Sequence, residues 1–140
     1  RGGSIEHHGG GDWVFPTVLS QVNHSMKIMT EETFGPIIPI MSVSSQDEAI
    51  HYANDTEYGL SGAVFGEESV AKSIAKKIEA GAISINDAGL TSILYDGEKN
   101  SFKSSGLGGS RMGPTSIQRF FRKKVLYTNT NSQNDPWWFN

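Results

Sequence analysis

Two adjacent glutamates, Glu31 and Glu32, are separated by a single threonine from Phe34 and an apolar stretch that continues to Ile40. The simplest interpretation is a solvated turn that leads into a buried strand. The alternative is that one carboxylate grips a polar ligand, since a carboxylate can accept hydrogen bonds from two neighbouring sugar hydroxyls and charge-assisted bonds are the stronger kind. The ring of Phe34 would then shield a flat ligand from water. These residues by themselves leave the ligand open.

Two other groups of polar residues match known site patterns less well. His7 and His8 follow Glu6 on a glycine-rich stretch, but their spacing matches none of the strong metal-ligand patterns, so we predict no metal site. The stretch GLGGSRMG (106–113) contains a G-x-G pair, but Arg111 stands where a dinucleotide-binding loop needs its third glycine. We interpret it as a turn cluster that leads into a helix.

Basic and aromatic residues alternate in RFFRKK (119–124), as they can in nucleic-acid-binding patches. The formal net charge of the chain is −3, which argues against nucleic acid as a partner. We therefore expect the cations to complement the end of a helix and Phe120 and Phe121 to pack inward.

Length and composition limit the classes of protein that are possible. A chain of 140 residues corresponds to one domain or to a piece of a larger one. With no cysteine, these residues contain no disulfide, no Cys-based metal site and no Cys nucleophile. There is no apolar run long enough to span a membrane, so we expect no membrane partner. The first residues lack both a signal-like apolar segment and an initiator Met. We expect a cytoplasmic protein and a start partway through a longer one.

The elements that position these residues follow from the hydrophobic pattern. The segments 37–43, 59–66 and 82–86 are short apolar runs that predict strands, and the first of them should be buried on both faces. Helices are predicted between them. The first begins with Ser45 and Glu48 in capping-box spacing, and the second covers 67–81 with Val70, Ile74 and Ile78 on one buried face and Gly81 as its stop.

This order of elements predicts an α/β fold, a parallel βαβαβ sheet in a three-layer arrangement. Ligands bind beyond the carboxyl ends of the strands in such sheets, and Asn86 and Asp87 stand at one of these ends. A long loop follows, then a short helix opened by Pro114, then a last strand over 124–130 and a tail. Upstream, Pro16 interrupts an apolar segment, which favours an edge strand or extended chain there.

Four stretches occur in an order and spacing that closely resemble the C-terminal part of the NAD(P)-dependent aldehyde dehydrogenase superfamily. They are MKIMTEETFGPIIPI, EAIHYANDTEYGLSGAVF, IEAGAISIN and FKSSGLGGSRMG. The resemblance covers roughly residues 2–128. The combination of E-E-x-F-G-P with N-D-x-x-Y-G-L is its most specific part.

The resemblance implies an enzyme that oxidises an aldehyde to a carboxylic acid with NAD or NADP. In that family a cysteine attacks the aldehyde, hydride passes to the nicotinamide, and water releases the acid. By the same resemblance, Glu32 binds the hydroxyls of the nicotinamide ribose and Phe34 lies beside the nicotinamide. Asn86 and Asp87 would belong to the substrate pocket, although the stretch EKNSFKSSG differs from the Pro-Phe-Gly-Gly run of many members.

The resemblance also implies a division of the chain. Residues 1–122 would be the C-terminal part of a catalytic domain, 123–130 an oligomerisation strand and 131–140 a C-terminal tail. The nucleophilic cysteine, the general-base glutamate and most of the cofactor-binding half would lie upstream, so this chain alone is predicted to be inactive. The expected partners are an aldehyde substrate and further copies, as a dimer or tetramer. The alternatives are a non-enzymatic assembly or binding fragment and a small flavodoxin-like nucleotide binder.

Overall fold

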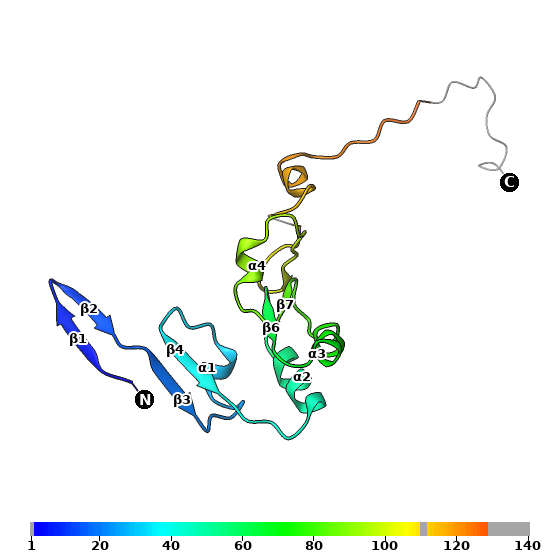
Figure 1. The fold of residues 1–140 in the computed structure, drawn as a ribbon. Helices are drawn as coiled ribbons and strands as arrows, with labels where there is room; N and C mark the ends of the chain where they lie inside the picture. Colours follow the sequence, from blue (N-terminus) through cyan, green and yellow to red (C-terminus); the bar gives the residue numbers. More distant parts are fainter. Residues whose placement is uncertain (1, 110–111, 129–140) are drawn as a thin grey trace.

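The computed structural model describes residues 2–109 and 112–128, and it begins with a projecting hairpin (Figure 1). Strand β1 (Ile5–His8) pairs antiparallel with β2 (Gly11–Val14). Gly9 and Gly10 form the turn with φ values of 58° and 85°. Two successive positive φ values define the tight hairpin turn that glycine adopts at no steric cost.

A parallel strand pair follows. Strand β3 (Thr17–Ser20) lies beside β4 (Ile37–Ile40), and the one-turn helix α1 (Lys27–Thr30) lies in the connection between them. Pro16 falls between β2 and β3, as the interrupted pattern predicted. The prediction that 37–43 is buried on both faces is wrong for this chain: Ile38 and Ile40 are 58% and 52% exposed. The structure pairs β4 with β3 alone, so alternate side chains of β4 remain open to solvent.

Helix α2 (Gln46–Asn54) leads from this pair into the rest of the molecule. The hydroxyl of Ser45 accepts a bond of 3.1 Å from the backbone N–H of Glu48, as the capping-box spacing predicted. The carboxylate of Glu48 does not return to Ser45. It accepts bonds of 2.6 Å from both the N–H and the hydroxyl of Ser44, one residue earlier.

A parallel βαβ unit forms the best-packed part of the fold and confirms one predicted crossover. Strands β6 (Gly62–Val64) and β7 (Ile83–Ile85) pair in parallel, and α3 (Glu68–Ala75) connects them. Ala71 on α3 is 2% exposed, whereas Val70 is 39% exposed. The helix face toward the sheet is therefore centred on Ala71. The predicted stripe through Ile78 runs past the helix, which ends at Ala75.

The single βαβαβ sheet is not observed among the described residues. The predicted strand 59–66 is divided into β5 (Tyr58–Gly59) and β6, and β5 pairs antiparallel with β8 (Phe102–Lys103). Strand β4 pairs with β3, so the described strands form four two-stranded sheets, two parallel and two antiparallel. The fold is a small mixed α/β fragment.

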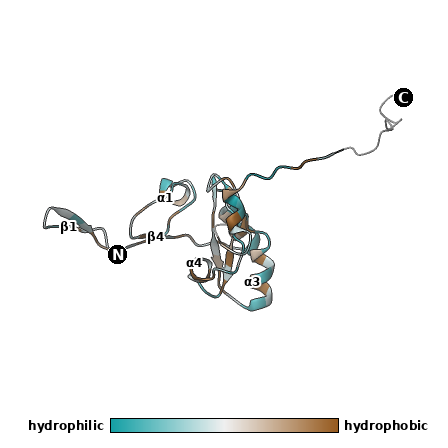
Figure 2. Ribbon diagram, turned by 90° about the horizontal axis from the view of Figure 1, so that it is seen from above, coloured by the Kyte–Doolittle hydropathy of each residue, from teal (hydrophilic) through white to brown (hydrophobic). Residues whose placement is uncertain are grey.

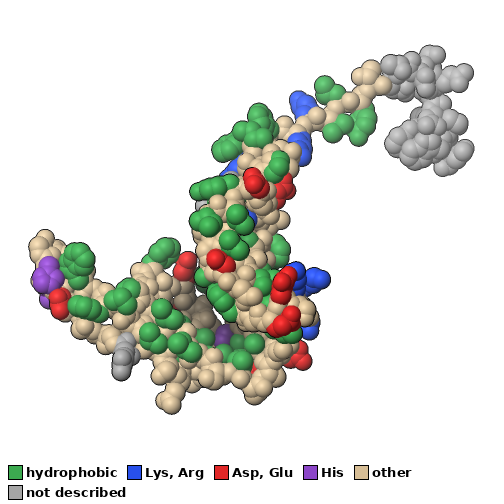
Figure 3. Space-filling view, viewed as in Figure 1, with side chains coloured by type: hydrophobic (Ala, Val, Ile, Leu, Met, Phe, Trp, Pro, Cys, Tyr) green, Lys and Arg blue, Asp and Glu red, His purple; other side chains and the backbone are tan. Residues whose placement is uncertain are grey.

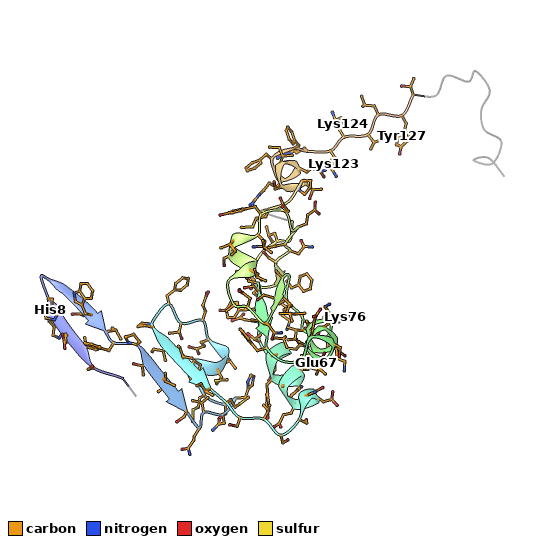
Figure 4. All side chains as sticks on the ribbon, in the orientation of Figure 1. His8, Glu67, Lys76, Lys123, Lys124 and Tyr127 are labelled. Carbon is orange, nitrogen blue, oxygen red and sulfur yellow. The ribbon has the colours of Figure 1, made fainter. Side chains whose placement is uncertain are left out.

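The C-terminal part leaves this body as extended chain. After α4 (Leu90–Ile93), the 3-10 helix η1 (Ser116–Phe120) follows Pro114. Phe120 and Phe121 are 78% and 66% exposed, so their predicted inward packing is wrong within this chain. Residues 124–128 are extended without a strand partner among the described residues, and Figure 4 shows Lys123, Lys124 and Tyr127 along this segment. Residues 129–130 of the predicted strand and the tail 131–140 lie outside the described residues.

Little apolar surface is buried in this chain. Among the described residues the buried hydrophobic side chains are Val22, Val64 and Ala71. The space-filling view shows hydrophobic side chains on the surface of the body and of the C-terminal segment (Figure 3), and the ribbon in Figure 2 shows that hydrophobic residues occur along both. In the described part of the chain no helix has the length and apolar character to cross a membrane. The same residues hold no cluster of three or more His, Cys, Asp or Glu side chains suited to a metal ion.

Candidate functional site

The two glutamates singled out in the sequence have different surroundings. Glu31 terminates α1: its N–H donates to the carbonyl of Lys27 at 2.7 Å, and its carboxylate lies 3.3 Å from the Lys27 ammonium. The carboxylate of Glu32 has no hydrogen bond or ion pair within the described residues. The local fold therefore uses Glu31 in an ion pair and leaves the Glu32 oxygens available to accept hydrogen bonds.

Both glutamates line a hollow of about 530 Å³ between α1 and the strand segment 58–63. Its other walls come from the end of α2, from residues 78–80 in the connection after α3, and from Ser104 and Ser105, after β8. The space-filling view shows the surface recessed between the β3–β4 pair and the body that holds β6 and β7 (Figure 3). Its lining includes both carboxylates and hydroxyls, from Glu31, Glu32 and Glu79 and from Ser61, Ser104 and Ser105.

Phe34 lies outside this hollow. Its side chain is 96% exposed, in the turn that precedes β4, and it is not among the residues that line the cavity. An aromatic ring this exposed is available to pack against a ligand or against another part of a protein. The structure therefore brings Glu32 to a cavity and leaves Phe34 at the surface two residues further along.

The charges at the hollow affect Tyr58, the first residue of β5. The negative charge of Glu57 raises the pKa of the Tyr58 hydroxyl, and loss of hydration and a hydrogen bond with Glu57 raise it further. Smaller contributions come from the charges of Glu32 and Glu31. Each carboxylate disfavours the phenolate, so Tyr58 remains a neutral hydroxyl and the acidic residues face it from two segments.

Asn86 and Asp87 follow β7, and their side chains make local bonds. Asn86 has a positive φ of 54°, and its amide pairs with both backbone groups of Gly66, accepting from N–H at 2.8 Å and donating to C=O at 2.9 Å. A carboxylate oxygen of Asp87 accepts from the N–H groups of Gly89 and Leu90 at 2.5 and 2.9 Å. These bonds fix the ends of β6 and β7 and the start of α4.

A second hollow adjoins the first, since Leu60 and Ser61 line both. It measures about 210 Å³ and lies between these residues, α4 and the segment 99–101. Its lining residues include Leu60 and Met112 together with polar side chains, among them Ser92, Lys99 and Asn100. Asn86 and Asp87 do not line it; Thr91 and Asn100 do.

Sequence reasoning missed a cluster at the end of α2. The Lys103 ammonium donates to the carbonyls of Asn54 and Thr56 at 2.6 and 3.2 Å and lies 2.9 Å from the Glu79 carboxylate. The Asn54 side-chain amide donates a hydrogen bond to the Lys77 carbonyl at 2.9 Å and accepts one from the Glu79 N–H at 2.8 Å. No sequence pattern connects these residues, because they lie about 25 and 50 positions apart.

The profile of the Aldehyde dehydrogenase family matches residues 1–126. The chloroplastic betaine aldehyde dehydrogenase of Beta vulgaris is 34% identical over 140 residues, which is 99% of this chain and 27% of that protein. The 3,6-anhydro-alpha-L-galactose dehydrogenase of Streptomyces coelicolor is 36% identical over 123 residues, which is 87% of this chain and 24% of that protein.

Solved structures agree with these sequence relationships. The protein PutA of Anabaena variabilis is 57% identical with a TM-score of 0.85, and the match covers 100% of this chain and 30% of that one. A betaine aldehyde dehydrogenase of Staphylococcus aureus, solved in complex with NAD+, is 33% identical with a TM-score of 0.84, and the match covers 98% and 27% of the two chains. The chain therefore belongs to the aldehyde dehydrogenase family. It spans about a quarter of the length of the curated relatives that it matches.

Proposed function

We propose that this segment is part of an oxidoreductase that oxidises an aldehyde to a carboxylic acid with NAD+ or NADP+, and that Glu32 binds the ribose next to the nicotinamide. The observation that carries the proposal is the Glu32 carboxylate, which lines a hollow of about 530 Å³ and has no hydrogen bond or ion pair among the described residues. Membership of the family and the NAD+ complexes of its solved relatives support the choice of ligand.

The residues of the hollow suit a ribose. Two vicinal hydroxyls can donate to the two oxygens of one carboxylate, and such bonds to a charged acceptor are stronger than neutral ones. Phe34 follows Glu32 by two residues, and its exposed aromatic face could pack against the flat nicotinamide ring. The coenzyme, when bound, supplies the acceptor for hydride. The role of Glu32 and Phe34 is to orient it, and the nucleophilic cysteine must come from outside these residues, which contain none.

This assignment predicts a difference between the two neighbouring glutamates. In the complete enzyme that contains this segment, Glu32→Gln should slow hydride transfer about tenfold or more, because charge-assisted bonds to the ribose become weaker neutral ones. Glu31→Gln is the matched control: its carboxylate pairs with Lys27 at an exposed position and should leave the rate nearly unchanged.

Stopped-flow measurement of NADH formation tests the prediction, together with the melting temperature of each variant. The melting temperature should barely move in either variant, since neither carboxylate is buried. A Glu32→Gln enzyme with wild-type hydride transfer would refute the proposed role.

The substrate side of the site is part of the same proposal. Asn86 and Asp87 belong to the pocket that receives the aldehyde, and their bonds to Gly66, Gly89 and Leu90 explain how they could hold its walls in place. The chain by itself should not oxidise aldehydes, because covalent capture requires a nucleophile. NADH production by the purified 140-residue chain, with any of a panel of aldehydes, would contradict this.

The proposal extends to assembly. The family resemblance assigns residues 123–130 to a strand that pairs with another subunit, and the described part of it is extended and exposed. Val125, Leu126 and Tyr127 are 68%, 83% and 92% exposed. An open extended segment with apolar side chains is the kind of surface that pairs with a second chain. We propose that the complete enzyme is a homo-oligomer that uses it.

A further inference from the structure

His24 contacts the end of α2 from the turn that precedes α1. Its Nε2 lies 2.8 Å from the backbone carbonyl of Asp55 and 3.0 Å from a carboxylate oxygen of the same residue. Its ring packs on Tyr52 with 4.8 Å between ring centroids, and the side chain is only 14% exposed. His24 thus joins the part of the chain that carries β3, β4 and α1 to the part that begins with α2.

The hydrogen bonds define the state of the ring. Both atoms near Nε2 are acceptors, so Nε2 carries the proton and donates it. Nδ1 is buried and has no hydrogen-bond partner among the described residues. Within the described residues, the polar contact that the His24 ring makes is therefore the one from Nε2–H to Asp55.

A short, internally bonded stretch connects His24 to the glutamates. The Asn23 side chain accepts bonds of 3.1 and 2.5 Å from the N–H and hydroxyl of Ser25, and the Met26 N–H donates to the Asn23 carbonyl at 3.1 Å. Helix α1 begins at the next residue, Lys27, and ends at Thr30, with Glu31 as its C-cap. This turn and the single turn of α1 connect the His24 anchor to Glu31 and Glu32 along the chain.

The other side of the contact is fixed as well. The turn that contains Asp55 is held by Lys103 through the Asn54 and Thr56 carbonyls, and by the Asn54 amide through Lys77 and Glu79. This turn and Thr30–Glu31 line a common hollow of about 400 Å³. Their separation decides where Glu32 stands relative to β5.

Charge opposes this arrangement. Asp55 and Glu57 on the turn face Glu31 across the hollow, with Glu32 directly after it. Like charges at such a site repel one another, and Lys27 offsets only the charge of Glu31. The bond between His24 and Asp55 opposes the repulsion that is left. We propose that His24 is a positioning residue for Glu32: its Nε2–H bond to Asp55 holds the Glu31–Glu32 segment at the distance at which Glu32 can bind the coenzyme. This inference rests on the proposed function.

Three variants of the complete enzyme test it. His24→Phe keeps an aromatic ring beside Tyr52 but removes the donor, and should weaken NAD+ binding about tenfold, as expected for a lost bond to a charged acceptor. Amide hydrogen exchange should accelerate over residues 27–32 and stay unchanged over 68–75. His24→Gln places an amide donor near the position of Nε2 and should restore both readouts to within about twofold of the wild type. Glu32→Gln is measured alongside.

The outcomes separate the two proposals. If Glu32→Gln weakens NAD+ binding and His24→Phe does not, the positioning role is overturned and the role of Glu32 stands. If Glu32→Gln binds NAD+ like the wild type, the proposed function fails and the inference fails with it. If His24→Phe does not fold, His24→Leu removes the same Nε2–H donor with a smaller side chain. Wild-type NAD+ affinity and unchanged exchange over 27–32 in that variant would overturn the inference.

Discussion

Single residues show how side-chain oxygens begin the helices of this fold. Glu67 caps α3: its carboxylate accepts bonds of 3.0 Å from the N–H groups of Ser69 and Val70 and 2.5 Å from the Ser69 hydroxyl. The Ser69 hydroxyl, followed by the two N–H groups, lowers the pKa of Glu67 from its ordinary value of 4.5. The ionised form is therefore the one that stabilises the helix.

The lowered pKa predicts a pH dependence. A carboxylate with a depressed pKa contributes stability above its ordinary value, here 4.5, and loses it as the pH falls through the folded value. Glu67→Gln should therefore reduce helix content at pH 7, and the difference from the wild type should vanish in acid. Circular dichroism of peptides spanning 66–81 measures this. Glu79→Gln, beyond the helix end, is the control and should not lower helix content at pH 7.

At the scale of elements, a close backbone contact connects β5, the end of the α3 crossover and the segment before β8. The Gly81 N–H donates to the Gly59 carbonyl at 3.0 Å, and a Cβ built on Gly81 would lie 1.8 Å from the Asn100 carbonyl oxygen. The sequence predicted Gly81 as a helix stop. In the structure, Gly81 lies five residues after Lys76, the C-cap of α3. Its backbone there contacts the backbones of Gly59 and Asn100.

The contact predicts a sharp difference between two glycines. Gly81→Ala forces backbone displacement and should cost about 1–3 kcal/mol or more in the free energy of unfolding, as overpacking does. Gly97→Ala is the matched control, because a Cβ there meets nothing within 4 Å and its φ is ordinary for other residues. Chemical denaturation of the complete enzyme compares them. Equal unfolding midpoints for the two variants would show that the contact can relax freely.

At the scale of the whole molecule, the exposed C-terminal segment is the subunit contact that we propose. Besides Val125, Leu126 and Tyr127, the preceding η1 region exposes Ile117, Phe120 and Phe121. Truncation of the complete enzyme after Arg122 removes the extended segment and leaves the phenylalanines uncovered. We expect smaller assemblies, or aggregation through the uncovered apolar surface. Light scattering gives the mass, and a truncated enzyme that keeps the wild-type mass would show that this segment is not the subunit contact.

Local sequence by itself determined the features that depend on neighbours along the chain. The cap at Ser45, the α3 crossover between β6 and β7, the short helix after Pro114 and the break at Pro16 follow from helix-terminus chemistry, hydrophobic period and proline geometry, which act within a few residues. The ordered motifs also identified the family, which the profile match confirmed.

Only the tertiary structure decided which strand pairs with which and which polar groups meet. Strand β4 pairs with β3, and the segment 58–64 is shared between β8 and β7, because backbone hydrogen bonds form with whichever edge lies alongside and the hydrophobic pattern does not specify that edge. In the same way, His24 reaches Asp55 across 31 positions. Such contacts depend on how the elements pack in space, and the spacing of residues along the sequence does not specify that packing.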